Sequence, residues 1–164
     1  MKIKCAQSRV ATSHRVLQGD LNEHGTVFGG LILKIVDAEA SIAAMRVAKT
    51  PIVTAGMDHL QFIRPFKLQD ALEMEAYVTG IGHRSIEVFV KVIGEHLLTG
   101  ERFLGFTCFV TYVIANHQQQ CPYNGVETQT SEERQIVAGY QQRRQQRRAN
   151  RHTQQKLLQA IDLY

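Results

Sequence analysis

The spacing of hydrophobic residues changes along the chain, and each spacing predicts a different kind of element. Residues 8–17 mix β-branched and polar side chains, which is typical of a strand. From Gly29 to about Ala48, apolar residues recur every three or four positions, which predicts one long helix. We expect Lys49-Thr50-Pro51 to end this helix, because the residue before a proline avoids the helical conformation.

Four strand-like segments follow the predicted helix. Residues 52–63 form the first, and residues 71–79 and 85–98 alternate between apolar and polar side chains. The last, 102–115, is a nearly continuous apolar and aromatic run. With hairpin-like connections, these segments predict an α+β architecture in which an antiparallel sheet wraps around one long central helix. Such a sheet cannot close over its helix alone, so its outer strands favour dimerisation.

The positive charge is confined to one end of the chain. The net charge is +4, but residues 1–130 contain 12 basic and 12 acidic residues, whereas residues 131–164 contain seven basic and three acidic ones. The pI of about 9.1 therefore describes the tail and not the folded body. A high pI that arises from the tail is no evidence for nucleic-acid binding, so we expect no nucleic-acid partner.

This asymmetry suggests three regions: a folded domain (1–116), a linker (117–130) and a basic, Gln/Arg-rich helical tail (131–164). Thr130-Ser131-Glu132-Glu133 resembles a capping box that opens a helix. Residues 141–148 repeat every four positions without one apolar side chain, so we expect a solvated helical extension. An oligomer contact or a polyanion-binding arm is the alternative. Near its end, Leu157, Leu158 and Ile161 could dock on another surface.

Several classes of protein are disfavoured by what the sequence lacks. No apolar run approaches the roughly 18 residues of a membrane span, and the N-terminus lacks a long secretory-type stretch. Three widely spaced cysteines suggest neither a disulfide framework nor a metal site, so a cytoplasmic location is expected. The seven histidines show no ligand spacing, so no metal is expected. No Gly-x-Ser-x-Gly motif is present, which disfavours a serine hydrolase.

Candidate chemistry lies where the helix begins. Gly29 and Gly30 leave backbone N–H groups at a helix N-terminus unobstructed, and such groups can stabilise the oxyanion of an acyl-transfer reaction. Asp37 is a carboxylate on an apolar helix, ~10 Å along the axis from Gly30 at 1.5 Å per residue. A second, antiparallel copy of the helix would bring its Asp37 beside these amides, so the site makes more sense in a dimer. The alternative on physical grounds is a purely structural role for the glycines, in tight packing.

A set of short motifs in fixed order resembles the acyl-CoA hydrolase branch of the hotdog-fold superfamily. The resemblance extends from about Val10 to Asn116, and Gln69 stands where the family has a glycine. The motifs are Asn22-x-x-Gly25-x-x-Phe28-Gly29-Gly30, Asp37, Val53-Thr54 through Phe62-Ile63-Arg64-Pro65, Asp70, Gly82-His83-Arg84-Ser85-Ile86-Glu87-Val88 and Phe109-Val110-Thr111-Tyr112-Val113.

The resemblance implies an acyl-CoA thioesterase that hydrolyses fatty acyl-CoA, without a cofactor other than the CoA of its substrate. Asp37 would act as general base or as nucleophile. Asn22 of a second subunit would position the water or the thioester, while the amides of Gly29 and Gly30 polarise the carbonyl. Arg84 and Ser85 would lie near CoA, with Arg64 and Phe28 as further substrate contacts. The minimal unit would be a homodimer, and a hexamer (a trimer of dimers) is expected.

Two other functions remain open at this point. Asp20 and His24 loosely resemble the Asp/His pair of hotdog-type enoyl-CoA hydratases, although the spacing is one residue short and a proline is missing. A non-enzymatic, acyl-CoA-binding regulator of the same fold is the other alternative. The presence of Asp37 and the lack of a helix-turn-helix pattern disfavour the regulator.

Overall fold

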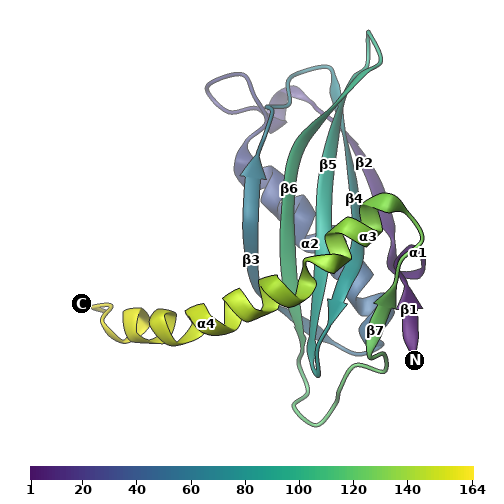
Figure 1. Cartoon of the computed structure of the whole chain (residues 1–164). Coiled ribbons are helices and arrows are strands. Elements are labelled where there is room, and N and C mark those ends of the chain that lie inside the picture. Colours follow the sequence, from purple (N-terminus) through teal and green to yellow (C-terminus); the bar gives the residue numbers. More distant parts are fainter.

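A computed structural model describes the whole chain, residues 1–164 (Figure 1). The elements are β1 (Lys2–Lys4), α1 (Cys5–Ser8), β2 (Val10–Arg15), the 3-10 helix η1 (Gln18–Asp20), α2 (Gly29–Ala48), β3 (Ile52–Phe62), β4 (Asp70–Ile81), β5 (Ser85–His96), β6 (Glu101–Ile114), β7 (Gly125–Glu127), α3 (Ser131–Ala138) and α4 (Tyr140–Gln159). No helix is both long enough and apolar enough to cross a membrane.

One five-stranded antiparallel sheet organises the molecule, with the strand order β2-β4-β5-β6-β3. Helix α2 lies behind this sheet in Figure 1, whereas α3 and the first half of α4 lie in front of it. We call the face of the sheet that α2 covers the inner face, and the face that α3 and α4 cover the outer face. The predicted α+β fold, a sheet wrapped around one long helix, is confirmed.

Helix α2 occupies the predicted residues, and its apolar stripe faces the sheet. Its buried residues recur every three or four positions, and the small side chains of Ala40, Ala43 and Ala44 are fully buried against the strands. The helix ends at Lys49, which adopts a left-handed conformation (φ 55°) and donates its N–H to the carbonyl of Met45. The left-handed residue and the following Thr50-Pro51 stop the helix where the sequence predicts.

The alternation of β5 separates the two faces of the sheet. Ile86, Val88 and Val90 are fully buried on the inner face, as the pattern predicts. Glu87 and Phe89 point to the outer face and are also buried, because α3 and α4 cover them. The strand is therefore sandwiched between two layers along much of its length.

The predicted hairpin succession is wrong for one strand. β3 does not pair with β4, which follows it, but with β6 at the far side of the sheet. The segment between Phe62 and Asp70 carries the chain from one edge to the other side. Strand patterns define which face a residue occupies but not which strand it joins, so the sequence did not reveal this crossover.

The predicted linker contains structure as well. β7 lies within it and pairs with β1 in a parallel, two-stranded sheet. The amide of Cys121 also donates to the carbonyl of His83 at 3.0 Å. Three-residue strands are too short to show a period, so sequence patterns missed β1 and β7.

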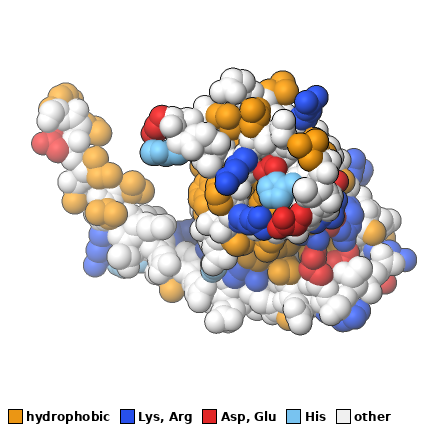
Figure 2. Space-filling view, turned by 90° about the horizontal axis from the view of Figure 1, so that it is seen from above, with side chains coloured by type: hydrophobic (Ala, Val, Ile, Leu, Met, Phe, Trp, Pro, Cys, Tyr) orange, Lys and Arg blue, Asp and Glu red, His pale blue; other side chains and the backbone are white.

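The tail begins as predicted and then departs from the prediction. Thr130 caps α3, accepting a hydrogen bond from the amide of Glu133 at 3.1 Å. The expected solvated extension is wrong for the first half of α4, because Tyr140 is buried with its ring over Gly80 and Arg143 bonds to Glu87 at 2.8 Å. The second half does project from the body, and Figure 2 shows hydrophobic side chains at its free end. Leu157 and Leu158 there are each 65% exposed, so within one chain they dock on nothing.

Candidate functional site

Asp37 lies in the middle of α2, where two residues of the sheet hold it. The hydroxyl of Thr54, on the edge strand β3, donates to the Asp37 carboxylate at 2.8 Å. The phenol of Tyr112, on β6, donates to the Asp37 backbone carbonyl at 2.9 Å. Burial raises the pKa of the Tyr112 phenol, and the charge of Asp37 acts in the same direction, so this phenol stays a donor. The carboxylate is therefore fixed in position while one of its oxygens remains free of protein donors.

The N-terminus of α2 presents the predicted free amides. Gly29 and Gly30 form the first turn, whose N–H groups have no intrahelical acceptor, and neither amide donates elsewhere in the chain. A side chain at Gly30 would collide with the ring of Phe28, since a Cβ there would lie 2.4 Å from a ring carbon. The close approach of this ring explains why glycine suits the position.

Asn22 lies in the loop that leads to α2 and uses its side chain within that loop. Its Oδ1 accepts from the amides of His24 at 2.9 Å and Thr26 at 3.2 Å, and its Nδ2 donates to the Thr26 hydroxyl at 3.1 Å. One Nδ2 hydrogen is left for another partner. No hydrogen bond joins Asn22 to Asp37 within one chain, so the structure of a single chain does not assemble the whole predicted site.

The side of the molecule that carries Asp37 is open and apolar. β3 is an edge strand and pairs only with β6. Large hydrophobic side chains on β3, on α2 and beside them are exposed, namely Val53, Phe62, Ile63, Ile42, Met45 and Phe28. An exposed strand edge beside an apolar surface is a typical site for pairing with another chain.

The predicted CoA contacts lie at separate places. Phe28 is 60% exposed beside the start of α2, and its ring lies against Gly30. Arg64 stacks on Phe103, with its guanidinium carbon 4.3 Å from the ring centre, and pairs with Glu101. Arg84 and Ser85 lie at the start of β5 in a cleft beneath α4, on the outer side of the sheet. A single chain therefore does not bring these residues together.

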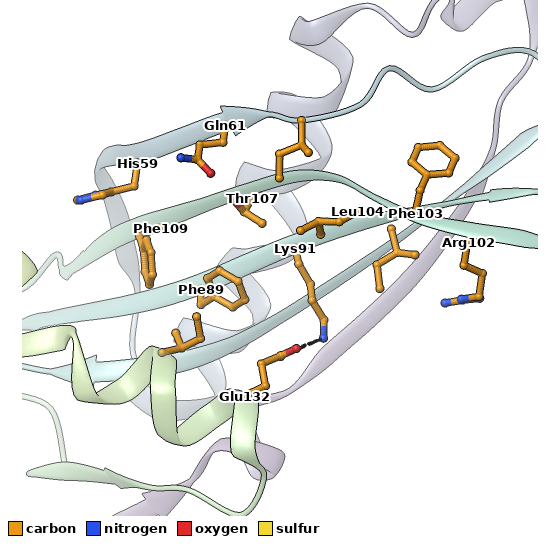
Figure 3. Close-up of a pocket in the computed structure, with 13 residues that line it drawn as sticks. His59, Gln61, Phe89, Lys91, Arg102, Phe103, Leu104, Thr107, Phe109 and Glu132 are labelled. Carbon is orange, nitrogen blue, oxygen red and sulfur yellow. Dashed lines mark hydrogen bonds and ion pairs between the residues drawn. The ribbon is translucent and has the colours of Figure 1, made fainter.

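A larger apolar groove lies on the outer face and contains none of the predicted catalytic residues. It has a volume of about 700 Å³, and Figure 3 shows Phe89, Phe109 and Leu104 pointing into it beside α3. Lys91 and Glu132 form an ion pair at its rim, at 2.7 Å. Size alone would make this groove the candidate active site. The free amides of Gly29 and Gly30 and the Asp37 carboxylate, however, lie on the inner side of the sheet.

Other predicted candidates are tested by the same geometry. Asp20 contacts His14 at 2.8 Å and not His24, and His24 is largely exposed with only Glu23 nearby. The hydratase alternative therefore lacks its Asp/His pair. No cluster of three or more His, Cys, Asp or Glu side chains is placed to hold a metal ion.

Sequence reasoning missed Thr54 and Tyr112 as partners of Asp37. Thr54 lies 17 residues and Tyr112 lies 75 residues from Asp37, so no local spacing links them. Thr54 lies in a segment that carries the family resemblance, but its hydroxyl alone assigns it no role, because threonine is common in strands.

Comparisons with known proteins bear on this site. The family model described as Thioesterase superfamily matches residues 24–100, which include the start of α2 and Asp37. The chain is 39% identical over 158 residues to the uncharacterized acyl-CoA thioester hydrolase YkhA of Bacillus subtilis, covering 96% of this chain and 92% of that protein. The chain belongs to the acyl-CoA thioester hydrolases of the thioesterase superfamily.

Solved structures of acyl-CoA hydrolases have the same fold throughout. The acyl-CoA hydrolase of Bacillus cereus superposes with a TM-score of 0.92 at 35% identity, covering 99% of this chain and all of that one. The acyl-CoA hydrolase of Staphylococcus aureus in complex with butyryl coenzyme A gives 0.88 at 26% identity, covering 97% and 98%. An apo-hexameric acyl-CoA thioesterase gives 0.85 at 36% identity, covering 91% and 96%.

Three variants of the Staphylococcus aureus hydrolase have been solved, with alanine in place of an asparagine, an aspartate or a threonine. In that chain the asparagine and the aspartate are 15 positions apart, and the aspartate and the threonine are 17 apart. In the chain described here, Asn22, Asp37 and Thr54 have the same separations of 15 and 17 positions. Two of these three residues were predicted from the sequence, and the third is the hydrogen-bond partner of Asp37.

Proposed function

We propose that this protein hydrolyses fatty acyl-CoA thioesters to the free acid and CoA, with Asp37 as the catalytic carboxylate. The observation that carries the proposal is the Asp37 carboxylate, held by the Thr54 hydroxyl at 2.8 Å in a member of the acyl-CoA thioester hydrolases. The equal separations of the residues replaced in the Staphylococcus aureus enzyme support the same assignment.

The reaction follows from the placement of these groups. Asp37 takes a proton from water as the water oxygen bonds to the thioester carbon. The carbonyl oxygen becomes an oxyanion, and the N–H groups of Gly29 and Gly30 stabilise it. The carbon–sulfur bond then breaks, and the CoA thiolate leaves and receives the proton. Direct attack by Asp37, through an anhydride that water then hydrolyses, uses the same groups.

The site is shared between two subunits in this proposal. Asp37 lies ~10 Å along α2 from Gly30, too far for one helix to serve both the carbonyl and the water. Pairing of two copies through the open β3 edge would place Asp37 of one chain beside the glycine amides and Asn22 of the other. The exposed apolar residues along this edge support such pairing. The hexameric relative supports further assembly into a trimer of dimers.

We further propose that the enzyme needs no cofactor and acts in a reducing compartment. No cofactor is needed beyond the CoA of the substrate, because the proposed chemistry uses only water, a carboxylate and backbone amides. The three cysteines are free thiols, which supports action in a reducing compartment such as the cytoplasm.

Release of thiol from acyl-CoA tests the assignment of Asp37. We expect Asp37→Asn to lower kcat by about 100-fold to 10,000-fold, as the loss of a general base does. Glu39→Gln, a change of the same size and charge on the same helix, is the control and should keep full activity. Thr54→Val should lower kcat by about tenfold or more, because it removes a hydrogen bond to a charged group. Full activity in Asp37→Asn would overturn the assignment.

Mixing two inactive variants tests whether the site is shared. Chains with Asn22→Ala and chains with Asp37→Ala, unfolded and refolded together, should regain about a quarter of the wild-type activity, since half of the dimers then hold one intact site. Each variant refolded alone is the control. Lack of any regained activity, with mixed dimers demonstrated by mass spectrometry, would place Asn22 and Asp37 in one chain's site.

A further inference from the structure

An apolar cluster lies at the end of α4, where the helix has left the body of the protein. Residues 141–156 contain one apolar side chain, Ala149, and Leu157, Leu158 and Ile161 then follow closely. All three are more than half exposed, and Figure 2 shows hydrophobic side chains gathered at this end. They lie three and four positions apart, so they share one face of the helix, which we call the apolar tail end. Apolar residues concentrated on an otherwise polar helix are typical of a contact surface.

The apolar tail end cannot reach the body of its own chain. Arg147 is the last residue of α4 that the body partly covers, and it pairs with Asp58 on β3 at 3.0 Å. Since α4 continues as one helix to Gln159, Leu157 stands about 15 Å beyond Arg147 at 1.5 Å per residue. Figure 1 shows this part of α4 pointing away from the sheet, past β3. A surface that covers the tail end therefore has to belong to another molecule.

The apolar groove on the outer face, which we call the outer groove, is a surface of the matching kind. Its volume is about 700 Å³, and Phe89, Phe109 and the 43% exposed Leu104 point into it (Figure 3). Ile63 lines the groove and also belongs to the exposed apolar surface at the β3 edge, through which we propose that two copies pair. The outer groove is therefore continuous with a surface that further copies of this chain approach.

The charges around the outer groove are already paired, which favours an uncharged partner. Lys91 pairs with Glu132 at 2.7 Å, and Arg102 pairs with Glu73. A carboxylate or a phosphate would find no free cation at this rim. Residues 157–161, with the sequence Leu-Leu-Gln-Ala-Ile, carry no charge. Docking of this run in the groove would therefore leave no charge buried without a partner.

We propose that the apolar tail end of one chain docks in the outer groove of a neighbouring chain. A helix that lays apolar anchors three and four positions apart into a hydrophobic groove is a common mode of recognition. Each chain has one tail end and one outer groove, so the contact is heterologous and joins chains head to tail. Three chains joined in this way close a ring, which matches the proposed trimer of dimers. The number three rests on that proposed assembly, whereas the contact itself does not depend on the proposed reaction.

Disulfide cross-linking of the full-length protein tests the contact directly. We expect chains that carry both Leu158→Cys and Leu104→Cys to form covalent dimers and trimers under mild oxidation, because the two thiols meet across the contact. Reducing agent should return these products to single chains. Gln159→Cys combined with Leu104→Cys is the matched control. Gln159 lies on the polar side of the same helix, so this pair should give about fivefold less covalent product or lower.

Other occupants of the two surfaces would give different products. Covalent dimers from Leu158→Cys alone would show that tail ends meet each other, and an internal disulfide in the double variant would show that the tail folds onto its own groove. Either result would overturn the proposal, as would equal cross-linking of the Gln159 control or a lack of larger products from the double variant. Wild-type protein, in which Cys121 is partly exposed, provides the background.

The mass of the assembly provides a second measurement. Wild-type protein should sediment as a hexamer of the 18.5 kDa chain. Leu157→Gln/Leu158→Gln should sediment as a dimer, because it keeps the size of two exposed side chains but removes their apolar contact. Leu97→Gln/Leu98→Gln is the matched control, since it changes two exposed leucines that follow β5, and it should keep the wild-type mass.

Three results of sedimentation would overturn the proposal. They are a hexamer that persists in the tail variant, equal dissociation of the tail variant and its control, and a wild type that forms no more than a dimer. Cross-linking and sedimentation involve no turnover. Absence of thiol release from the wild type would therefore sink the proposed function, while the contact would still be decided by these two measurements.

Discussion

Ile86 and Glu87 are neighbours on β5, yet they face two layers that are held in different ways. Ile86 is fully buried against α2 in an apolar core. Glu87 is as deeply buried, but it binds α4 through Arg143 and Arg147. The inner layer is therefore stabilised by apolar burial, which is insensitive to charge, whereas the outer layer adds ion pairs to its own apolar contacts, and these ion pairs need every partner present.

The two layers also differ in what they carry. The inner layer holds Asp37 and the glycine amides on a helix that is packed along most of its length. The outer layer ends in a helix that leaves the body halfway along, where its side chains become exposed. A rigid helix suits a reaction that needs fixed geometry.

Truncation of the inner partner should have the largest effect on stability. Ile86→Ala removes most of a fully buried side chain, so we expect the free energy of unfolding to fall by about 2–5 kcal/mol. Urea denaturation measures this loss. Leu98→Ala, at a position that is 81% exposed, is the control and should change stability by less than about 0.5 kcal/mol. A loss below about 1 kcal/mol in Ile86→Ala would mean that almost no cavity is left, and it would contradict the inner-core assignment.

Neutralisation of the outer partner should act locally. Glu87→Gln leaves Arg143 and Arg147 without their carboxylate, so we expect α4 to detach more often, with about 1–3 kcal/mol less docking free energy. Trypsin should then cleave faster after Arg144 and Arg148, while the urea midpoint of the core changes little. Glu95→Gln, on the same strand but in a partly exposed pair with Arg102, is the control. Parallel loss of core stability without faster cleavage would show that α4 unfolds only together with the core.

Acid should loosen the outer layer before the inner one. Burial raises the pKa of Glu133, but hydrogen bonds from the amides of Gln129 and Thr130 and from Arg9 outweigh it, and the net pKa lies below the ordinary value. Its contribution to stability is therefore present above the unfolded-state pKa and is lost as the pH falls through the lower folded-state pKa.

Hydrogen exchange measures this sequence of events. As the pH is lowered through the carboxylate range, amides of α3 should lose protection while those of α2 keep it. In Glu133→Gln this pH dependence should be much weaker. Equal loss of protection in both helices would show that the acid effect is global.

Salt should produce the smallest difference. The ion pairs of Arg147 are partly exposed, so screening by high salt should weaken α4 docking by less than about 1 kcal/mol. The inner layer should gain slightly or stay unchanged. Trypsin cleavage of α4 at low and high sodium chloride, corrected for the effect of salt on trypsin itself, measures the shift. Greater protection of α4 at high salt would contradict an electrostatic docking.

The sequence by itself determined the inner half of the protein. The period of three to four residues predicted α2 from Gly29 to Ala48, and the alternation of β5 predicted that Ile86, Val88 and Val90 share a buried face. Such patterns are local, and a core forms wherever they repeat. The same local reading found the glycines and Asp37, because both lie on one helix.

Only the tertiary structure decided the rest. The pairing of β3 with β6, the hydrogen bond of Thr54 to Asp37 and the docking of α4 on Glu87 all join residues far apart in the chain. An arginine repeat without apolar residues has the pattern of a solvated helix. Nothing in that repeat shows that the buried carboxylate of Glu87 on the sheet will bind two of its arginines. Long-range partners are chosen by the folded surface, and a charge reveals its partner only when both have been placed in space.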